Sequence, residues 1–354
     1  MWINSFLYFW GSSLLLLLAL PPTTTLAQTS SSSSSDPVVC DCGFRDENNH
    51  VWSEIWYADY SNYKSNLHKD AHYVVMDYTV NAKHKDTLNR VFDPNNVQID
   101  EQGQVQLAVR KVNDNEYTSS SFGTRRQDIL YGTFRASIKT SPVPGTVAAF
   151  YFYRNDTCEI DIESLSRMQN PWKTFFSVQP QVYNPDGSAS TLTNDKHELP
   201  FDPTSEYHEY RFDWIPDRID YYIDGQHANS FNTTVPQSPG RVMLNHWTDG
   251  NPKYSGAAPD QDAFLSVANL TVFFNSSDAH EPLSCQKMQE PCNVAGKLIQ
   301  KASFIYLRLT LPAGASSSSS SSSSQPQSAA AHPHIQTSLC IVLVTALLYI
   351  LTIH

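Results

Sequence analysis

The sequence predicts an all-β fold, a sandwich or jelly roll of two antiparallel sheets, over residues 39–294. Two observations lead to this prediction. Short runs rich in β-branched and aromatic residues alternate with turn signals throughout the region, and no long amphipathic helical pattern interrupts them. The region also has the length of one large all-β domain.

The clearest expected strands come as hairpins. The runs 97–100 and 105–109 flank a Glu-Gln-Gly turn. Three further runs, 207–214, 218–223 and 226–231, are separated by Pro-Asp and Asp-Gly turns. Asp-Gly between alternating apolar residues is a strong hairpin signal, so we expect these runs to pair as neighbours.

Another hairpin is expected between residues 146–153 and 157–164, and its returning strand carries an acidic motif. Glu159, Asp161 and Glu163 alternate with two isoleucines, so a strand places the three acids on one face and the isoleucines on the other. Three acids side by side repel one another, which favours a catalytic cluster over an exposed acidic edge. Asp161 lies where it can hydrogen-bond one glutamate and share its proton.

The spacing of the two glutamates predicts a reaction type. Residues four apart on a strand are about 13 Å apart at Cα. Side chains that lean toward each other then leave carboxyl groups roughly 5–6 Å apart, close to the separation of about 5–5.5 Å in retaining glycosidases. The motif therefore favours double displacement through a covalent glycosyl-enzyme.

Aromatic residues predict a sugar-binding cleft beside the acids. On the preceding strand, Tyr151 and Tyr153 share one face, which we expect to line the cleft; the alternative is that both belong to the core. Asn245-His-Trp247 ends a strand and opens a loop, where Trp247 is placed as a sugar platform or as a packed side chain. Trp214 is assigned to the core.

The two ends of the chain predict a secreted, membrane-anchored protein. Residues 1–27 resemble a signal peptide and residues 28–38 a serine-rich spacer. Residues 295–328 are interpreted as a serine-rich stalk, and residues 329–354 as a GPI-attachment propeptide, with Ser328 as the attachment residue. A tail-anchored helix is the alternative. We expect a location at the cell surface or cell wall, with the GPI anchor in the plasma membrane.

Cysteines and sequons fit that compartment. Four cysteines flank the domain, which indicates two disulfides clasping its termini with the pairing left open, and Cys158 is expected to be a buried thiol. Four Asn-X-Ser/Thr sequons predict glycosylation. They are Asn155, Asn232, Asn269 and Asn275.

The net charge of the chain limits the classes of ligand that it can bind. The net charge is −11 and no basic stripe exists to follow phosphates, which excludes a nucleic-acid ligand. A neutral glucan is compatible with this charge. The cysteine spacing does not suggest zinc, and we expect no cofactor, no metal in the site and a monomer.

Several sequence blocks together resemble glycoside hydrolase family 16 over roughly residues 70–275. They are Tyr131-Gly-Thr-Phe-Arg135, Gly145-Thr-Val147, Glu159-Ile-Asp-Ile-Glu163, Tyr207–Trp214, Ile219–Gly225 and Asn245-His-Trp247. The resemblance implies a concanavalin A-like β-jelly roll whose concave sheet holds an extended glucan. The opening Cys42-Gly-Phe and the tail are similar to fungal cell-surface members.

The resemblance also implies residue roles. Glu159 is then the nucleophile, Asp161 its assisting carboxylate and Glu163 the general acid/base. A general acid needs a raised pKa, and we expect the two neighbouring carboxylates to raise that of Glu163. Substrate contacts fall on four residues, which are Tyr151, Tyr153, Asn245 and Trp247. The implied activity is hydrolysis of β-1,3 or mixed-linkage β-1,3-1,4 glucans of the cell wall. Alternatives are a wall transglycosylase acting on glucan or chitin chains, a glucan-binding lectin, and a structural wall protein.

The sequence departs from the family pattern near the motif. Thr157 stands where many lichenase-like members carry a tryptophan, and it completes the Asn155 sequon. Arg135 and Ser137 stand where lichenases have an acid and a base. We therefore expect an ordinary catalytic cluster in an altered cleft.

Overall fold

The structure is a computed structural model that describes residues 40–63, 66–278, 285, 290–294 and 306–307. All of them belong to one unit, residues 1–309. The signal peptide, most of the stalk, the GPI signal and Ser328 lie outside the described residues. Within the described part of the chain, no helix combines the length and apolar character that crossing a membrane requires.

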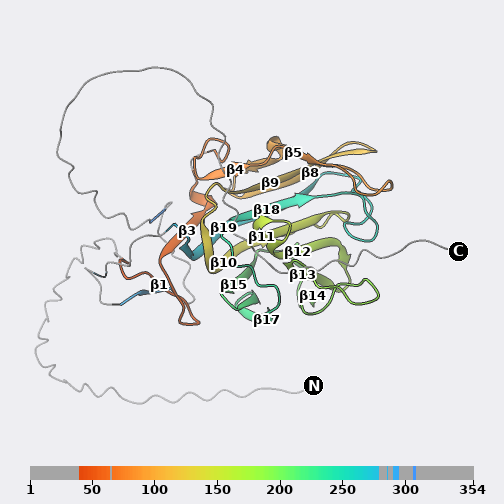
Figure 1. Cartoon of the computed structure of the whole chain (residues 1–354). Coiled ribbons are helices and arrows are strands. Elements are labelled where there is room, and N and C mark those ends of the chain that lie inside the picture. The colour runs from red at the N-terminus through yellow and green to blue at the C-terminus, as the bar shows by residue number, and fades with distance from the viewer. Residues whose placement is uncertain (1–39, 64–65, 279–284, 286–289, 295–305, 308–354) are drawn as a thin grey trace, which may run out of the picture. The chain divides into compact units, whose positions relative to one another are not determined.

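Two antiparallel sheets make up most of the fold. The front sheet contains the acidic motif, and Figure 1 shows its strands β9, β18, β11, β12, β13 and β14 side by side. In order it consists of β4 (Tyr73–Val75), β9 (Glu116–Thr124), β18 (Arg241–Trp247), β11 (Val147–Asn155), β12 (Cys158–Gln169), β13 (Trp172–Gln179) and β14 (Asn194–Glu198).

The back sheet pairs around β10 and β19. Its central strands are β17 (Gln226–Phe231), β16 (Arg218–Ile223), β15 (His208–Ile215), β10 (Ile129–Lys139) and β19 (Ala263–Ser276). The second edge of β19 pairs with β3 (Glu54–Asp59) and β8 (Val105–Asn113), and β7 (Val97–Ile99) pairs with β8. The strand β8 also pairs with β9, which joins the two layers.

Short elements complete the described structure. Near β9 these are β5 (Tyr78–Val80), β6 (Arg90–Phe92) and the 3-10 helices η1 (Tyr60–Asn62) and η2 (Pro94–Asn96). At the ends of the domain they are β1 (Phe44–Arg45), β2 (Val51–Trp52), β20 (Cys292–Asn293) and β21 (Tyr306–Leu307).

The core lies between the sheets and is built from alternate residues of both. Phe150 and Phe152 of β11 face inward, and Phe152 packs on Trp214 of β15 with ring centroids 4.3 Å apart. Ile160 and Ile162 of β12 join the same cluster, with 0% and 3% of their surface exposed. The alternation that buries the isoleucines therefore turns the acids of β12 to the outer face of the front sheet.

The predicted all-β sandwich is confirmed, and so are its hairpins. The strands β16 and β17 have the bounds expected from the sequence. Between them, Asp224 and Gly225 both have positive φ, at 46° and 73°, as a two-residue hairpin turn of the type-I′ kind requires. Trp214 is fully buried, as expected.

Two disulfides clasp the ends of the domain, as predicted, and the structure supplies their pairing. Cys40 bonds to Cys292 and Cys42 to Cys285. Each bond joins residues more than 240 positions apart, with sequence separations of 252 and 243. Cys158 lies outside both disulfides and is buried, as predicted.

Candidate active site

The three acids lie in successive cross-strand rows of the front sheet. Asp161 pairs with Tyr151 of β11 and Ser177 of β13, while Glu159 pairs with Tyr153 and Gln179. Cross-strand partners share a face, so acids, tyrosines and polar residues all point outward from the core.

Glu163 lies in a less polar row than the other two acids. Its strand partners are Ala149 of β11 and Phe175 of β13. Neither side chain can hydrogen-bond to a carboxyl group, so any partner for Glu163 must come from outside this row.

An open cavity of about 440 Å³ lies over these rows. Glu159, Asp161 and Glu163 all line it, together with Trp247 from the end of β18 and Arg90 from the start of β6. A cavity of this size is in the range of ligand-binding clefts. The sequence-predicted acids are thus brought together at the wall of one cleft.

Asp161 is the most constrained of the three acids. It is 6% exposed and accepts a hydrogen bond from Ser177 Oγ at 2.9 Å. Burial, and then the charges of Glu159 and Glu163, raise the pKa of Asp161 well above its usual value. Both effects favour the protonated form of Asp161.

Glu159 is linked to Asp161 by a hydrogen bond. Burial raises the pKa of Glu159 to about 7, and the hydrogen bond with Asp161 opposes this rise. The same bond raises the pKa of Asp161, so Asp161 is the donor and the Glu159 carboxylate the acceptor. A protonated Asp161 thus stabilises Glu159 in the ionised form that a nucleophile needs.

Glu163 is held by a tyrosine from outside the sheet. The hydroxyl of Tyr254, in the loop after β18, donates a hydrogen bond to Glu163 Oε2. Burial raises the pKa of Glu163, while the Tyr254 bond and the charge of Arg90 lower it. We expected the neighbouring carboxylates to raise this pKa, and that cause is wrong: desolvation does so, and the carboxylates act on Asp161 instead.

The four predicted substrate contacts occupy different depths. Trp247 lines the cavity but is only 6% exposed, with Arg90 stacked 4.6 Å from its ring centre. Asn245 donates a hydrogen bond from Nδ2 to the Tyr151 hydroxyl at 3.2 Å, and Tyr151 is 7% exposed. Tyr153 lies on the same face, half-buried. Their roles in substrate binding stay predictions.

Comparison with known proteins decides the family. The model of "Glycosyl hydrolases family 16" matches residues 84–262. The β-glucanase of Bacillus licheniformis is 31% identical over 185 residues, which cover 49% of this chain and 71% of that protein. The β-glucanase of Paenibacillus polymyxa is 29% identical over 183 residues, covering 49% and 72%.

The chain belongs to glycosyl hydrolase family 16. Solved structures agree with this fold. The Bacillus licheniformis β-glucanase structure aligns with a TM-score of 0.52 and 24% identity, over 62% of this chain and 97% of that one. An endo-β-1,3-glucanase from Pyrococcus furiosus aligns with a TM-score of 0.51 and 21% identity, over 65% and 97%. The family 16 chain is accordingly a glycosidase.

Three residues of the family 16 site were not predicted. Ser177, Arg90 and Tyr254 all line the cavity and contact or electrostatically influence the acids. Ser177 could have been predicted from strand pairing, because β13 follows β12 in the chain and pairs with it, which brings Ser177 beside Asp161. Arg90 and Tyr254 come from other elements, and only the fold brings them to the acids.

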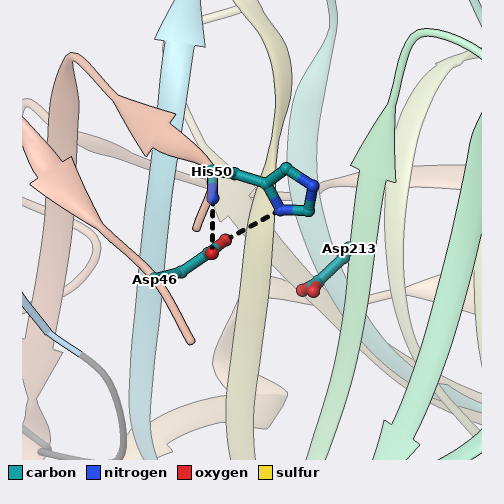
Figure 2. A group of neighbouring side chains, drawn as sticks. All are labelled: Asp46, His50 and Asp213. Carbon is teal, nitrogen blue, oxygen red and sulfur yellow. Dashed lines mark hydrogen bonds and ion pairs between the residues drawn. The ribbon is translucent and has the colours of Figure 1, made fainter. Parts of the chain in front are cut away.

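A second cluster of titratable residues lies behind the back sheet. Figure 2 shows Asp46 and His50 of the N-terminal segment beside Asp213 of β15, with their ligand-type atoms within 4.8 Å of one another. Asp46 already accepts bonds from Trp52 Nε1 and the His50 amide, both at 2.9 Å. Both oxygens of Asp213 accept from Arg211. A cation would compete with this guanidinium, so the donor set fits a structural brace rather than a metal site.

The four sequons differ in exposure. Asn155, at the β11–β12 hairpin, and Asn232, after β17, are exposed. Asn269 and Asn275 are half-buried in β19, and Asn275 Oδ1 accepts a hydrogen bond from the Ser53 amide at 3.0 Å. The exposed pair is therefore the better placed for glycosylation, which stays a prediction at all four.

Proposed function

We propose that this family 16 chain cleaves β-glucans with retention of anomeric configuration, by double displacement. One observation carries the proposal: Glu159, Asp161 and Glu163 share one face of β12 and line one cavity. The relatives named as β-glucanases support β-glucans as the substrate class, and among these we propose β-1,3 or mixed-linkage β-1,3-1,4 glucans.

In the first step Glu159 attacks the anomeric carbon. The hydrogen bond from protonated Asp161 favours the ionised form of Glu159 until the new bond removes its charge. Glu163, protonated, gives its proton to the leaving glycosidic oxygen as the bond to the anomeric carbon breaks. The products are a covalent glycosyl-enzyme and a free sugar chain.

In the second step Glu163 acts as a base. It removes a proton from an acceptor hydroxyl, which attacks the anomeric carbon and releases Glu159. With water as the acceptor the reaction is hydrolysis, and with a sugar hydroxyl it is transglycosylation. Both outcomes use the same three acids, so the nature of the acceptor decides between them.

The two glutamate roles are testable by chemical rescue. The full chain, produced in a secreting host, is incubated with an activated β-glucoside and azide. A Glu159→Ala variant is expected to yield an α-glycosyl azide, since azide takes the place of the nucleophile. Glu163→Ala is expected to yield a β-glycosyl azide from the trapped glycosyl-enzyme. Exchange of these two products would overturn the assignment.

The substrate class is tested on polymers. Wild type and Glu159→Gln are incubated with β-1,3-glucan and mixed-linkage glucan, with a labelled oligosaccharide acceptor. New reducing ends indicate hydrolysis, and labelled long products indicate transfer. Binding of glucan by the wild type without either product would contradict the proposal and favour a lectin.

We also propose that the protein is secreted as a monomer and held at the cell surface by a GPI anchor. The order of the two terminal segments supports secretion and the anchor, with an apolar N-terminal run and a serine tract followed by an apolar tail. Release of the protein from intact cells by phosphatidylinositol-specific phospholipase C would support the anchor. Retention on the cells after treatment, with a control GPI protein released, would contradict it.

A further inference from the structure

Glu163 depends on a loop for its hydrogen bonding. Its strand neighbours Ala149 and Phe175 offer no donor, and the Tyr254 hydroxyl donates to Oε2. A carboxyl group with one oxygen held in this way is restricted in rotation. Oε1 is then left to exchange the proton with the glycosidic oxygen.

The loop that carries Tyr254 is anchored to the same strand as Glu163. Arg167 of β12 donates from Nε to the Tyr254 carbonyl at 2.5 Å and from Nη2 to the Lys253 carbonyl at 2.9 Å. The Tyr254 and Gly256 amides both donate to the Asn251 carbonyl at 2.9 Å. These bonds fix the backbone from which the phenol reaches Glu163.

The Tyr254 ring is also held from the side. It lies nearly parallel to Trp247, at 18° with ring centroids 6.0 Å apart, and Arg90 lies over the Trp247 ring. This explains why Trp247 lines the cavity while exposing little of its surface. The tryptophan packs against both Arg90 and Tyr254, the two groups that act on Glu163.

The charged groups that line the cavity together with Glu163 come from several elements. They are Glu159 and Asp161 of β12, Arg90 of β6, Arg167 of β12, Lys196 of β14 and Lys253 of the loop. Tyr254, which is uncharged, forms a direct hydrogen bond to Glu163. Burial and the charge of Glu163 raise the pKa of Tyr254 well above its usual value, so the phenol remains a donor at any working pH.

We propose that Tyr254 is a positioning residue for the general acid/base, which holds Glu163 Oε2 so that Oε1 delivers and later receives the proton. The inference rests on the proposed function, since it assigns the residue that orients Glu163 for that reaction. Tyr254 does not itself exchange a proton with the substrate. Tyr254 therefore affects the rate only of those steps in which Glu163 transfers a proton.

The test compares two leaving groups in Tyr254→Phe. An oligosaccharide leaving group needs protonation, whereas 2,4-dinitrophenolate leaves without it. We expect kcat/KM to fall about ten- to a hundredfold on the oligosaccharide, the range for losing a hydrogen bond to a charged group. On the 2,4-dinitrophenyl glycoside we expect less than a threefold change, roughly, because protonation no longer limits the first step.

The pH profile provides a second readout. Loss of the Tyr254 donor disfavours the ionised form of Glu163 and raises its pKa. The alkaline limb of kcat/KM is therefore expected to move to higher pH by about one unit. Tyr183→Phe is the matched control, since Tyr183 is 64% exposed and does not line the cavity. It should leave both substrates and the profile unchanged.

Equal losses on the two leaving groups, with an unmoved alkaline limb, would overturn the inference and indicate that Tyr254 only packs the loop. Activity on the activated glycoside reports directly that the variant is folded. If the wild type cleaves neither substrate, the proposed function fails instead. The two failures are therefore distinguishable.

Discussion

The protonation state of Asp161 can be tested by two substitutions at that position. Asp161→Asn keeps the size of the side chain and is neutral at every pH. Its amide can donate to Glu159 while its carbonyl oxygen accepts from Ser177 Oγ, which now lies 2.9 Å from Asp161 Oδ2. Asp161→Ala removes both bonds.

The structure predicts that these variants differ widely. If Asp161 works as a neutral donor, the asparagine reproduces its bond to Glu159 and retains at least about a tenth of wild-type kcat/KM. The alanine loses a hydrogen bond to a charged acceptor, worth about 1.5–3 kcal/mol. This corresponds to a loss of roughly ten- to more than a hundredfold in rate.

The assay is kcat/KM on a soluble mixed-linkage glucan from pH 4 to 9, with thermal unfolding to verify that both variants fold. The hydrogen bond from Asp161 lowers the pKa of Glu159, so the acid limb is expected to stay in place in Asp161→Asn, which keeps a donor, and to move to higher pH in Asp161→Ala. Equal inactivity of the two variants would refute the reasoning, since it would mean that Asp161 acts as a carboxylate.

Three further predictions concern stability and modification. The raised pKa of Glu159, about 7, means that the folded state loses stability as pH rises from about 4.5 to 7. In urea unfolding, Glu159→Gln should therefore raise the free energy of unfolding by roughly 1–3 kcal/mol at pH 8 and by little at pH 4.5. Arg211→Met leaves the fully buried Asp213 without its ion pair and should lower the free energy of unfolding by about 3–5 kcal/mol. Arg218→Ala, in a half-exposed pair, should lower it by less than about 1 kcal/mol. Equal losses in the two variants would contradict a structural role for the cluster around Asp213. Asn155→Gln should remove one N-glycan by mass spectrometry, and an unchanged mass would refute glycosylation there.

Much of the fold was predictable because its signals are local. Apolar alternation and turn residues are written in consecutive positions, so β16 and β17 were predicted with their observed bounds. The same alternation predicted that Glu159, Asp161 and Glu163 share one face of their strand. The disulfide pairing did not follow, because it depends on which of two neighbouring cysteines at one end meets which at the other.

Among the residues that line the cavity, the sequence predicted the three acids of β12 and Trp247 at the end of β18. Arg90 and Tyr254 are 69 positions before and 95 positions after Glu159 in the sequence, counting from the residue numbers. Their arrival at Glu163 depends on packing between β6, the end of β18 and the loop that Arg167 anchors. The cause of the raised pKa at Glu163 was missed for the same reason, since burial is a property of the folded cleft.

The most direct test of the central claim is to trap the covalent intermediate. The full chain is incubated with an activated 2-deoxy-2-fluoro β-glucan oligosaccharide, digested and mapped by mass spectrometry. The account predicts one added glycosyl group, on Glu159, and no label in Glu159→Gln. A label on Glu163, or turnover of glucan that yields the inverted anomer without any adduct, would contradict it.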